Sequence, residues 1–176
     1  MINPEFLRKV RAEREKVART PFFILVWGPA ISARLGAKRL AIREHLAQQF
    51  GADNVVFSED DDPALQEMRE EMGDRAAEYY QASAADVVFV IAESMGSITE
   101  VALYESVLAA KSIIFVEERP PERQGFASQA YALLRVEAVE PEEWQSCERI
   151  RRLCLRFAEN KRLEKYKLEK YKSESS

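Results

Sequence analysis

Three uninterrupted apolar stretches constrain this chain more than any other feature: residues 22–27, 87–91 and 113–116. A strand with one solvated face alternates apolar and polar residues, whereas continuous apolar runs are typical of strands covered on both faces. Amphipathic segments with a helical period separate these runs. The alternation predicts one α/β domain, doubly wound in the flavodoxin- or Rossmann-like manner, with a parallel sheet of about five strands.

Capping and turn signals predict the remaining elements. Asn3-Pro4-Glu5 opens a helix, and Gly51 ends another that begins near Ser32. We expect further strands at 54–57 and near 134–139, a long helix from Pro63 to about residue 80, and further helices at 98–111 and 126–133. A final helix begins after residue 140 and frays beyond residue 161. The predicted organisation is an N-terminal helix (1–20), an α/β unit (21–141) and a C-terminal helix (142–176) within one domain.

The net charge of −4 is unevenly distributed. Residues 1–20 and 142–176 each carry +3, while residues 21–141 carry −10. The acidic centre argues against nucleic-acid binding, and the long terminal helices predict a homo-oligomer or a complex formed through them. No apolar run approaches the length of a membrane span, and the first residues do not resemble a signal peptide. We therefore expect no membrane association and a cytoplasmic location.

The residue inventory excludes several chemistries. His45 is the only histidine, so Ser-His-Asp hydrolysis, Cys-His catalysis and histidine-rich metal sites are not expected. Cys147 and Cys154 are seven residues apart on one helical face, where we expect buried thiols. No metal and no cofactor are predicted, and any chemistry runs on carboxylates and hydroxyls.

Ligands of doubly wound sheets bind beyond the carboxyl ends of the strands, so the turns there hold the candidate residues. Trp27, Gly28 and Pro29 follow the first strand, where a small residue lets backbone N–H groups approach an anion. Gly-Pro is equally an ordinary turn. The third strand leads into Glu93, Ser94, Gly96, Ser97 and Glu100. Ser97 and Glu100 also have the spacing of a capping box, and both roles can coexist.

An acidic turn, residues 59–62, follows the second strand. Asp62 precedes Pro63 and suits a helix N-cap, while Asp61 suits a solvated turn. Glu59 and Asp60 have no such structural role in the sequence, and they stand where a second catalytic carboxylate would be needed. A Mg²⁺ site is the alternative for this run of acids.

Three segments resemble the nucleoside 2-deoxyribosyltransferase-like proteins and the related nucleotide-processing group, which includes toxin-like effectors of bacterial phage defence such as those attached to retrons. They are Val26-Trp27-Gly28-Pro29, the strand exit 55–60, and residues 85–102 with the pattern Ser-x-Gly-Ser-x-x-Glu. The resemblance covers about residues 21–117. Its Ser-x-Gly-Ser form is closer to the effector and nucleotide-sensor branches of the group.

The resemblance implies that Glu100 is a nucleophile, that Gly28 and Gly96 allow close ligand approach, and that Ser97 meets the sugar or phosphate. The implied reaction breaks an N-glycosidic bond of a nucleoside, nucleotide or NAD, by hydrolysis or transfer. A carboxylate can trap or stabilise the oxocarbenium-like transition state of such a reaction.

The remaining candidates complete this hypothesis. Glu59, Asp60 or Glu93 would act as acid/base or as partners of the ribose hydroxyls, and Trp27 and Tyr104 would stack on a base unless they are core residues. Two other hypotheses remain open: a non-catalytic nucleotide-binding sensor, and a partner subunit of an oligomer with a vestigial pocket.

Overall fold

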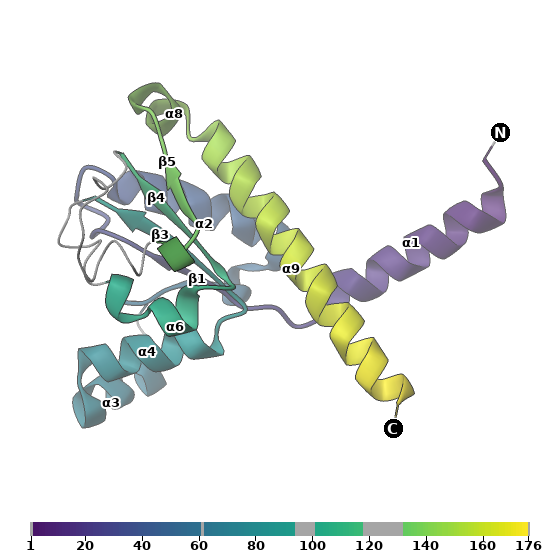
Figure 1. Ribbon diagram of the computed structural model, residues 1–176, viewed down its shortest axis with the longest axis horizontal. Helices are drawn as coiled ribbons and strands as arrows, with labels where there is room; N and C mark the ends of the chain where they lie inside the picture. The colour runs from purple at the N-terminus through teal and green to yellow at the C-terminus, as the bar shows by residue number, and fades with distance from the viewer. Residues whose placement is uncertain (1, 61, 94–100, 118–131, 176) are drawn as a thin grey trace.

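Five parallel strands form the centre of the protein (Figure 1), which is represented by a computed structural model describing residues 2–60, 62–93, 101–117 and 132–175. Their spatial order is β2-β1-β3-β4-β5. The strands are β1 (Ile24–Trp27), β2 (Val55–Phe57), β3 (Val87–Ala92), β4 (Ser112–Val116) and β5 (Val136–Ala138). The predicted doubly wound, five-stranded parallel α/β fold is confirmed, and its strand order is that of flavodoxin-like sheets.

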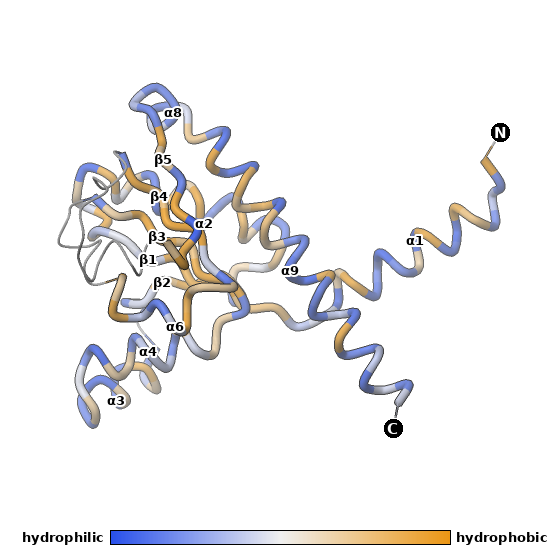
Figure 2. The backbone as a smooth tube through the Cα atoms, viewed as in Figure 1, coloured by the Kyte–Doolittle hydropathy of each residue, from blue (hydrophilic) through white to orange (hydrophobic). Residues whose placement is uncertain are grey.

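Both faces of the sheet are buried, as the apolar runs predict. Alternate strand residues such as Val26 and Phe89 belong to a core shared with α2 (Gly36–Phe50), α8 (Pro141–Ser146) and α9 (Glu148–Glu174). The intervening residues, such as Trp27 and Val90, face α4 (Asp74–Ala84) and α6 (Glu105–Leu108). Hydrophobic colour accordingly concentrates on the strands in Figure 2, and the outer helices are largely hydrophilic.

Two of the predicted helices are divided at a residue with a left-handed φ. The single helix expected after Pro63 consists of α3 (Pro63–Met72) and α4, because Gly73 interrupts it with a φ of 83°. The final helix is interrupted at Cys147, which has a left-handed φ of 56° and stays buried. Cys147 and Cys154 are free and buried as predicted, and burial raises the pKa of both thiols.

The terminal helices differ from expectation in length and contacts. α9 does not fray beyond residue 161 but continues to Glu174, so that prediction is wrong. Its last turns meet α1 (Pro4–Arg19), where the Tyr166 hydroxyl donates to Glu13 at 2.6 Å. This bond, together with those from Lys16 and Lys170, lowers the pKa of Glu13 to about 2.

Asn3 caps α1 as predicted, through a bond from the Glu5 amide to its side chain. In the part of the chain that the structure describes, no helix is both long enough and apolar enough to cross a bilayer.

Candidate functional site

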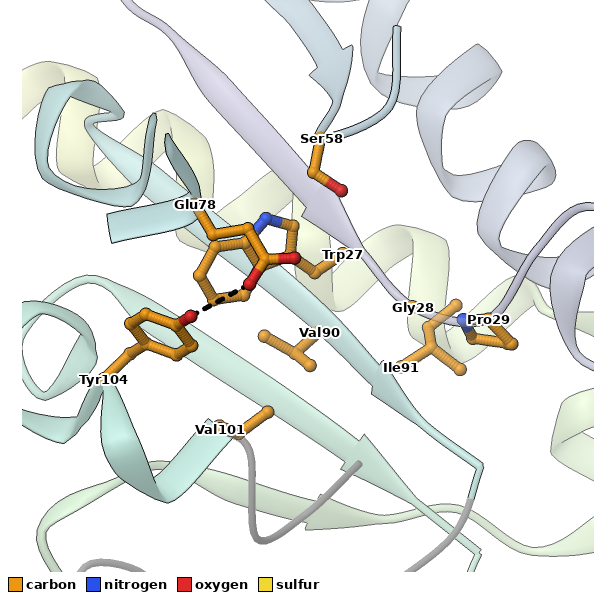
Figure 3. A pocket seen from close by; sticks show the side chains of 9 residues that line it. All are labelled: Trp27, Gly28, Pro29, Ser58, Glu78, Val90, Ile91, Val101 and Tyr104. Atoms are coloured by element: carbon orange, nitrogen blue, oxygen red, sulfur yellow. Dashed lines mark hydrogen bonds between the residues drawn. The ribbon is translucent and has the colours of Figure 1, made fainter. Parts of the chain in front are cut away.

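A pocket of about 290 Å³ lies beyond the carboxyl ends of β1 and β3, at the point where the strand order reverses. This is where doubly wound sheets bind their ligands. Figure 3 shows Trp27, Glu78 and Tyr104 grouped together, with Gly28 and Pro29 farther along the end of β1. The lining residues are Trp27, Gly28, Pro29, Ser58, Glu78, Val90, Ile91, Val101 and Tyr104.

Two aromatic side chains form one wall of the pocket. The Trp27 and Tyr104 ring centroids are 5.3 Å apart, and the rings are inclined at 60°. Both residues are largely buried, with 8% and 9% exposure. The buried indole nitrogen of Trp27 has no hydrogen-bond acceptor among the described residues. Such an unpaired buried donor costs about 1–3 kcal/mol.

Glu78 brings a carboxylate from α4 to this wall. The Tyr104 hydroxyl donates a 2.9 Å hydrogen bond to it and lies 3.4 Å from the Arg75 carbonyl oxygen. No ion pair to Glu78 is found within the described ranges of the chain. The pocket therefore contains a half-buried carboxylate whose described side-chain partner is a neutral phenol.

Gly28 lies in close packing that a side chain at this position would disturb. A Cβ atom at this position would lie 3.1 Å from the Ile91 side chain and 3.2 Å from that of Arg39, and its φ is 156°. The glycine thus lets the end of β1 pass close to β3 and α2. The space that a Gly28 side chain would enter is occupied by Ile91 and Arg39.

The side chain of Arg39, from α2, binds the backbone of this turn. Its guanidinium is 1% exposed and donates to the carbonyl oxygens of Val26 (3.0 and 3.1 Å), Gly28 (3.3 Å) and Pro29 (3.2 Å). Two further bonds reach both carboxylate oxygens of Glu59. One buried side chain thereby joins the turn after β1 to the turn after β2.

The acidic turn has structural roles that its sequence did not reveal. Burial raises the pKa of Glu59, but the hydrogen bonds and charge of Arg39 outweigh it, so the net pKa is lowered. Asp60 accepts from the Phe57 amide at 2.9 Å and pairs with Arg43 at 3.0 Å. The inference that these two acids lack a structural role is wrong. Asp62 caps α3 as predicted.

Glu93 belongs to a second arginine cluster at the same edge of the sheet. It accepts from the Leu35 amide at 3.3 Å and lies 3.5 Å from Arg34. Arg34 also binds Glu117 through two bonds of 2.5 and 2.7 Å, which lower the pKa of Glu117.

The structure brings together part of the predicted site. Trp27, Gly28, Pro29 and Tyr104 all line the pocket, while Glu59, Asp60 and Glu93 are not among its lining residues. Four other predicted residues, together with Asp61, lie outside the described residues: Ser94, Gly96, Ser97 and Glu100. Val101, which directly follows Glu100 in the sequence, lines the pocket.

Sequence reasoning missed Glu78 and Arg39. Glu78 sits in an ordinary amphipathic helix 26 residues before its partner Tyr104. Arg39 would have been detectable only as a charged residue on the inward face of α2, three residues before the buried Ile42. Gly36 was missed as well: a Cβ there would lie 2.2 Å from the Ala30 carbonyl oxygen.

Within the described ranges, no three His, Cys, Asp or Glu side chains gather as metal ligands would. His45 lies on α2 and is not among the lining residues of the pocket. Burial and the nearby charge of Arg151 lower its pKa.

Comparisons of this chain with protein-family models, curated proteins and solved structures find no match.

Proposed function

We propose that this protein cleaves or transfers the N-glycosidic bond of a nucleoside, a nucleotide or NAD by carboxylate chemistry. The observation that carries the proposal is Glu78, which lines the switch-point pocket bound by a phenol and, among the described residues, by no cation. The resemblance of residues 21–117 to nucleoside 2-deoxyribosyltransferase-like proteins supports the same reaction. It also extends the proposal to a role as a phage-defence or toxin effector.

Two carboxylates have different roles in the proposed reaction: Glu100 is the nucleophile, and Glu78 handles the proton. Glu100 attacks the anomeric carbon, and the glycosidic bond breaks with its electron pair going to the departing base. Glu78 and Tyr104 share a hydrogen bond, so this pair holds and moves the proton that the base takes up. Water, or a second base, then attacks the anomeric carbon, and the bond to Glu100 breaks with its electron pair returning to the carboxylate. The proton of the attacking group returns to the pair of Glu78 and Tyr104.

The other candidates receive different roles. Trp27 and Tyr104 provide an aromatic wall, and one of these rings would contact a base. Glu59, Asp60 and Glu93 are each bound to an arginine, so we assign them to holding the rim. A depressed pKa makes Glu59 a poor general acid at neutral pH.

The test is release of free base from a panel of nucleosides, nucleotides and NAD, followed by chromatography. We expect wild type to act on at least one class, and Glu100→Gln and Glu78→Gln to lower the rate at least about 100-fold. Glu44→Gln, an equivalent change on the exposed side of α2, is the matched control and should keep the wild-type rate.

The enzyme proposal fails if folded Glu100→Gln releases base as fast as wild type. It also fails if wild type releases no base from any compound. A rise in melting temperature with one of these compounds, without turnover, would instead identify the chain as a nucleotide sensor.

A further inference from the structure

Helix α1 carries apolar side chains that remain exposed. Val10 and Arg14 line a hollow of about 550 Å³ together with Phe50 and Leu163, whereas Phe6 and Leu7 lie outside it. None of its residues is buried, and Phe6, Leu7 and Val10 are 58%, 39% and 47% exposed. The helix projects away from the sheet and its covering helices (Figure 1). Among the described side chains of α1, only Glu13 forms hydrogen bonds to the rest of the chain, and it accepts them from Tyr166 and Lys170 of α9. Isolated helices of this length are marginal in water, so the face that carries Phe6, Leu7 and Val10 is suited to a partner.

The charges on α1 indicate the kind of surface that would bind this face. Phe6, Val10 and Arg14 follow one another at intervals of four residues, and Leu7 and Arg11 share the adjacent row. Arg11 and Arg14 form no ion pair with any residue that the structure describes. With 6 basic and 3 acidic side chains, α1 carries +3, so an acidic partner fits it.

A matching surface exists on the same chain, in the hairpin of α3 and α4. Like α1, α3 buries none of its residues. Residues 63–84 carry 5 acidic and 2 basic side chains, a net charge of −3. Glu67 and Glu71 are one turn apart on α3, both are exposed, and neither is ion-paired within the described ranges. The hairpin also exposes Met72, Tyr79 and Tyr80 at 45%, 45% and 52%.

We propose that α1 of one copy docks on the α3–α4 hairpin of a second copy. Its apolar residues would lie on the hairpin, with Arg11 and Arg14 toward the unpaired glutamates. Charge selects this pairing over others, because α1 against α1 or against the basic end of α9 would bring like charges together. The two surfaces lie at opposite ends of the molecule (Figure 1), which allows two antiparallel copies to form both contacts about one two-fold axis, the arrangement that we propose.

The interface would reach the candidate site through α4. Glu78 belongs to that helix, so the docked α1 would press on the element that positions the pocket carboxylate. The interface itself depends on no catalytic activity and is tested separately.

A second basic surface provides the control. Arg135, Arg149, Arg152 and Arg156 line a groove of about 460 Å³ beside β5, partly neutralised by ion pairs of Arg135 with Glu137 and Arg149 with Glu143. Reversing two of these arginines removes as much positive charge as reversing two on α1, at a different place.

The experiment measures the association of the full chain by analytical ultracentrifugation. We expect wild type to dimerise, and the variants R11E/R14E and E67R/E71R, each alone, to weaken the dimer at least tenfold. An equimolar mixture of these two variants should restore it, because both of its contacts again join opposite charges. R152E/R156E should dimerise like wild type. Circular dichroism verifies that every variant is folded.

Four results would overturn the proposal. They are a wild type that stays monomeric, a dimer insensitive to both charge reversals, a mixture that fails to associate, and a dimer broken by R152E/R156E. A monomer that binds phosphatidylserine-containing vesicles, and loses this in R11E/R14E, would assign α1 to a membrane surface instead.

Discussion

Two polar clusters beside the strand-order reversal differ in how fully they are hydrogen-bonded: one is centred on Arg39, and the other consists of Glu78, Tyr104 and Trp27. On the α2 side, Arg39 is 1% exposed and bonds to three carbonyl groups and to Glu59. On the α4 side, the carboxylate of Glu78 meets the Tyr104 hydroxyl, and the buried indole of Trp27 has no acceptor among the described residues. A cluster whose hydrogen-bonding groups all have partners fixes the backbone, whereas a cluster with an unpartnered group can still bind a ligand. The difference separates the scaffold from the wall of the proposed site.

Energetics make this comparison testable. Removing a buried guanidinium that donates to several carbonyl oxygens leaves those oxygens unsatisfied, which is the costly case. Removing a donor that has no acceptor leaves nothing unsatisfied. Substitutions on the two sides should therefore have unequal effects on stability.

The largest effect is expected for Arg39→Met. The change leaves Glu59 without its cation and removes the donors to Val26, Gly28 and Pro29. Glu59 is 47% exposed and can be hydrated, so the cost comes mainly from the carbonyl oxygens that lose their donor. We expect the free energy of unfolding to fall by about 2–3 kcal/mol, measured by urea denaturation.

Arg43→Met is the matched control on the same helix. Arg43 bonds to the Val55 carbonyl oxygen and Asp60, but its side chain is 31% exposed, so a loss of about 1 kcal/mol is expected. Equal losses of unfolding free energy in the two variants would show that Arg39 contributes no more to stability than Arg43.

Glu59→Gln should have an intermediate effect that depends on pH. The pKa of the Glu59 carboxyl group in the folded protein lies below its ordinary value of 4.5. The ionised carboxylate therefore stabilises the fold above pH 4.5, and this stabilisation is lost as the pH falls through the pKa of the folded protein. We expect a deficit of about 1–2 kcal/mol at neutral pH, shrinking on acidification. Denaturation curves of wild type and variant at several pH values measure it, and a deficit that grows in acid would contradict the assignment.

Trp27→Phe should have the smallest effect. It removes a buried donor that lacks an acceptor, and this gain offsets part of the lost packing, so a change within about 1 kcal/mol is expected. Tyr104→Phe removes a bond that is formed, to Glu78, and should cost about 0.5–1.5 kcal/mol. Thermal and urea denaturation compare the two. A loss from Trp27→Phe as large as that from Arg39→Met would remove the contrast between the two sides.

Part of the site was predictable because it lies at the ends of strands. Trp27, Gly28 and Pro29 follow the apolar run of β1 directly, so recognising the strand located them. Glu78 could not be found this way, since it meets Tyr104 only when α4 and α6 pack on the same face of the sheet. The roles of Glu59 and Asp60 were misjudged for the same reason, because their arginines lie 20 and 17 positions earlier in the chain.

The sequence by itself determined the parallel sheet. Strands buried on both faces require continuous apolar runs, and the helices between them require amphipathic periods, so local composition is sufficient for the fold class. The tertiary structure alone decided which carboxylates pair with arginines and that the carboxylate of Glu78 lines the pocket. The charge state of a side chain depends on neighbours within a few ångströms, and those neighbours come from segments that only the packed fold brings together.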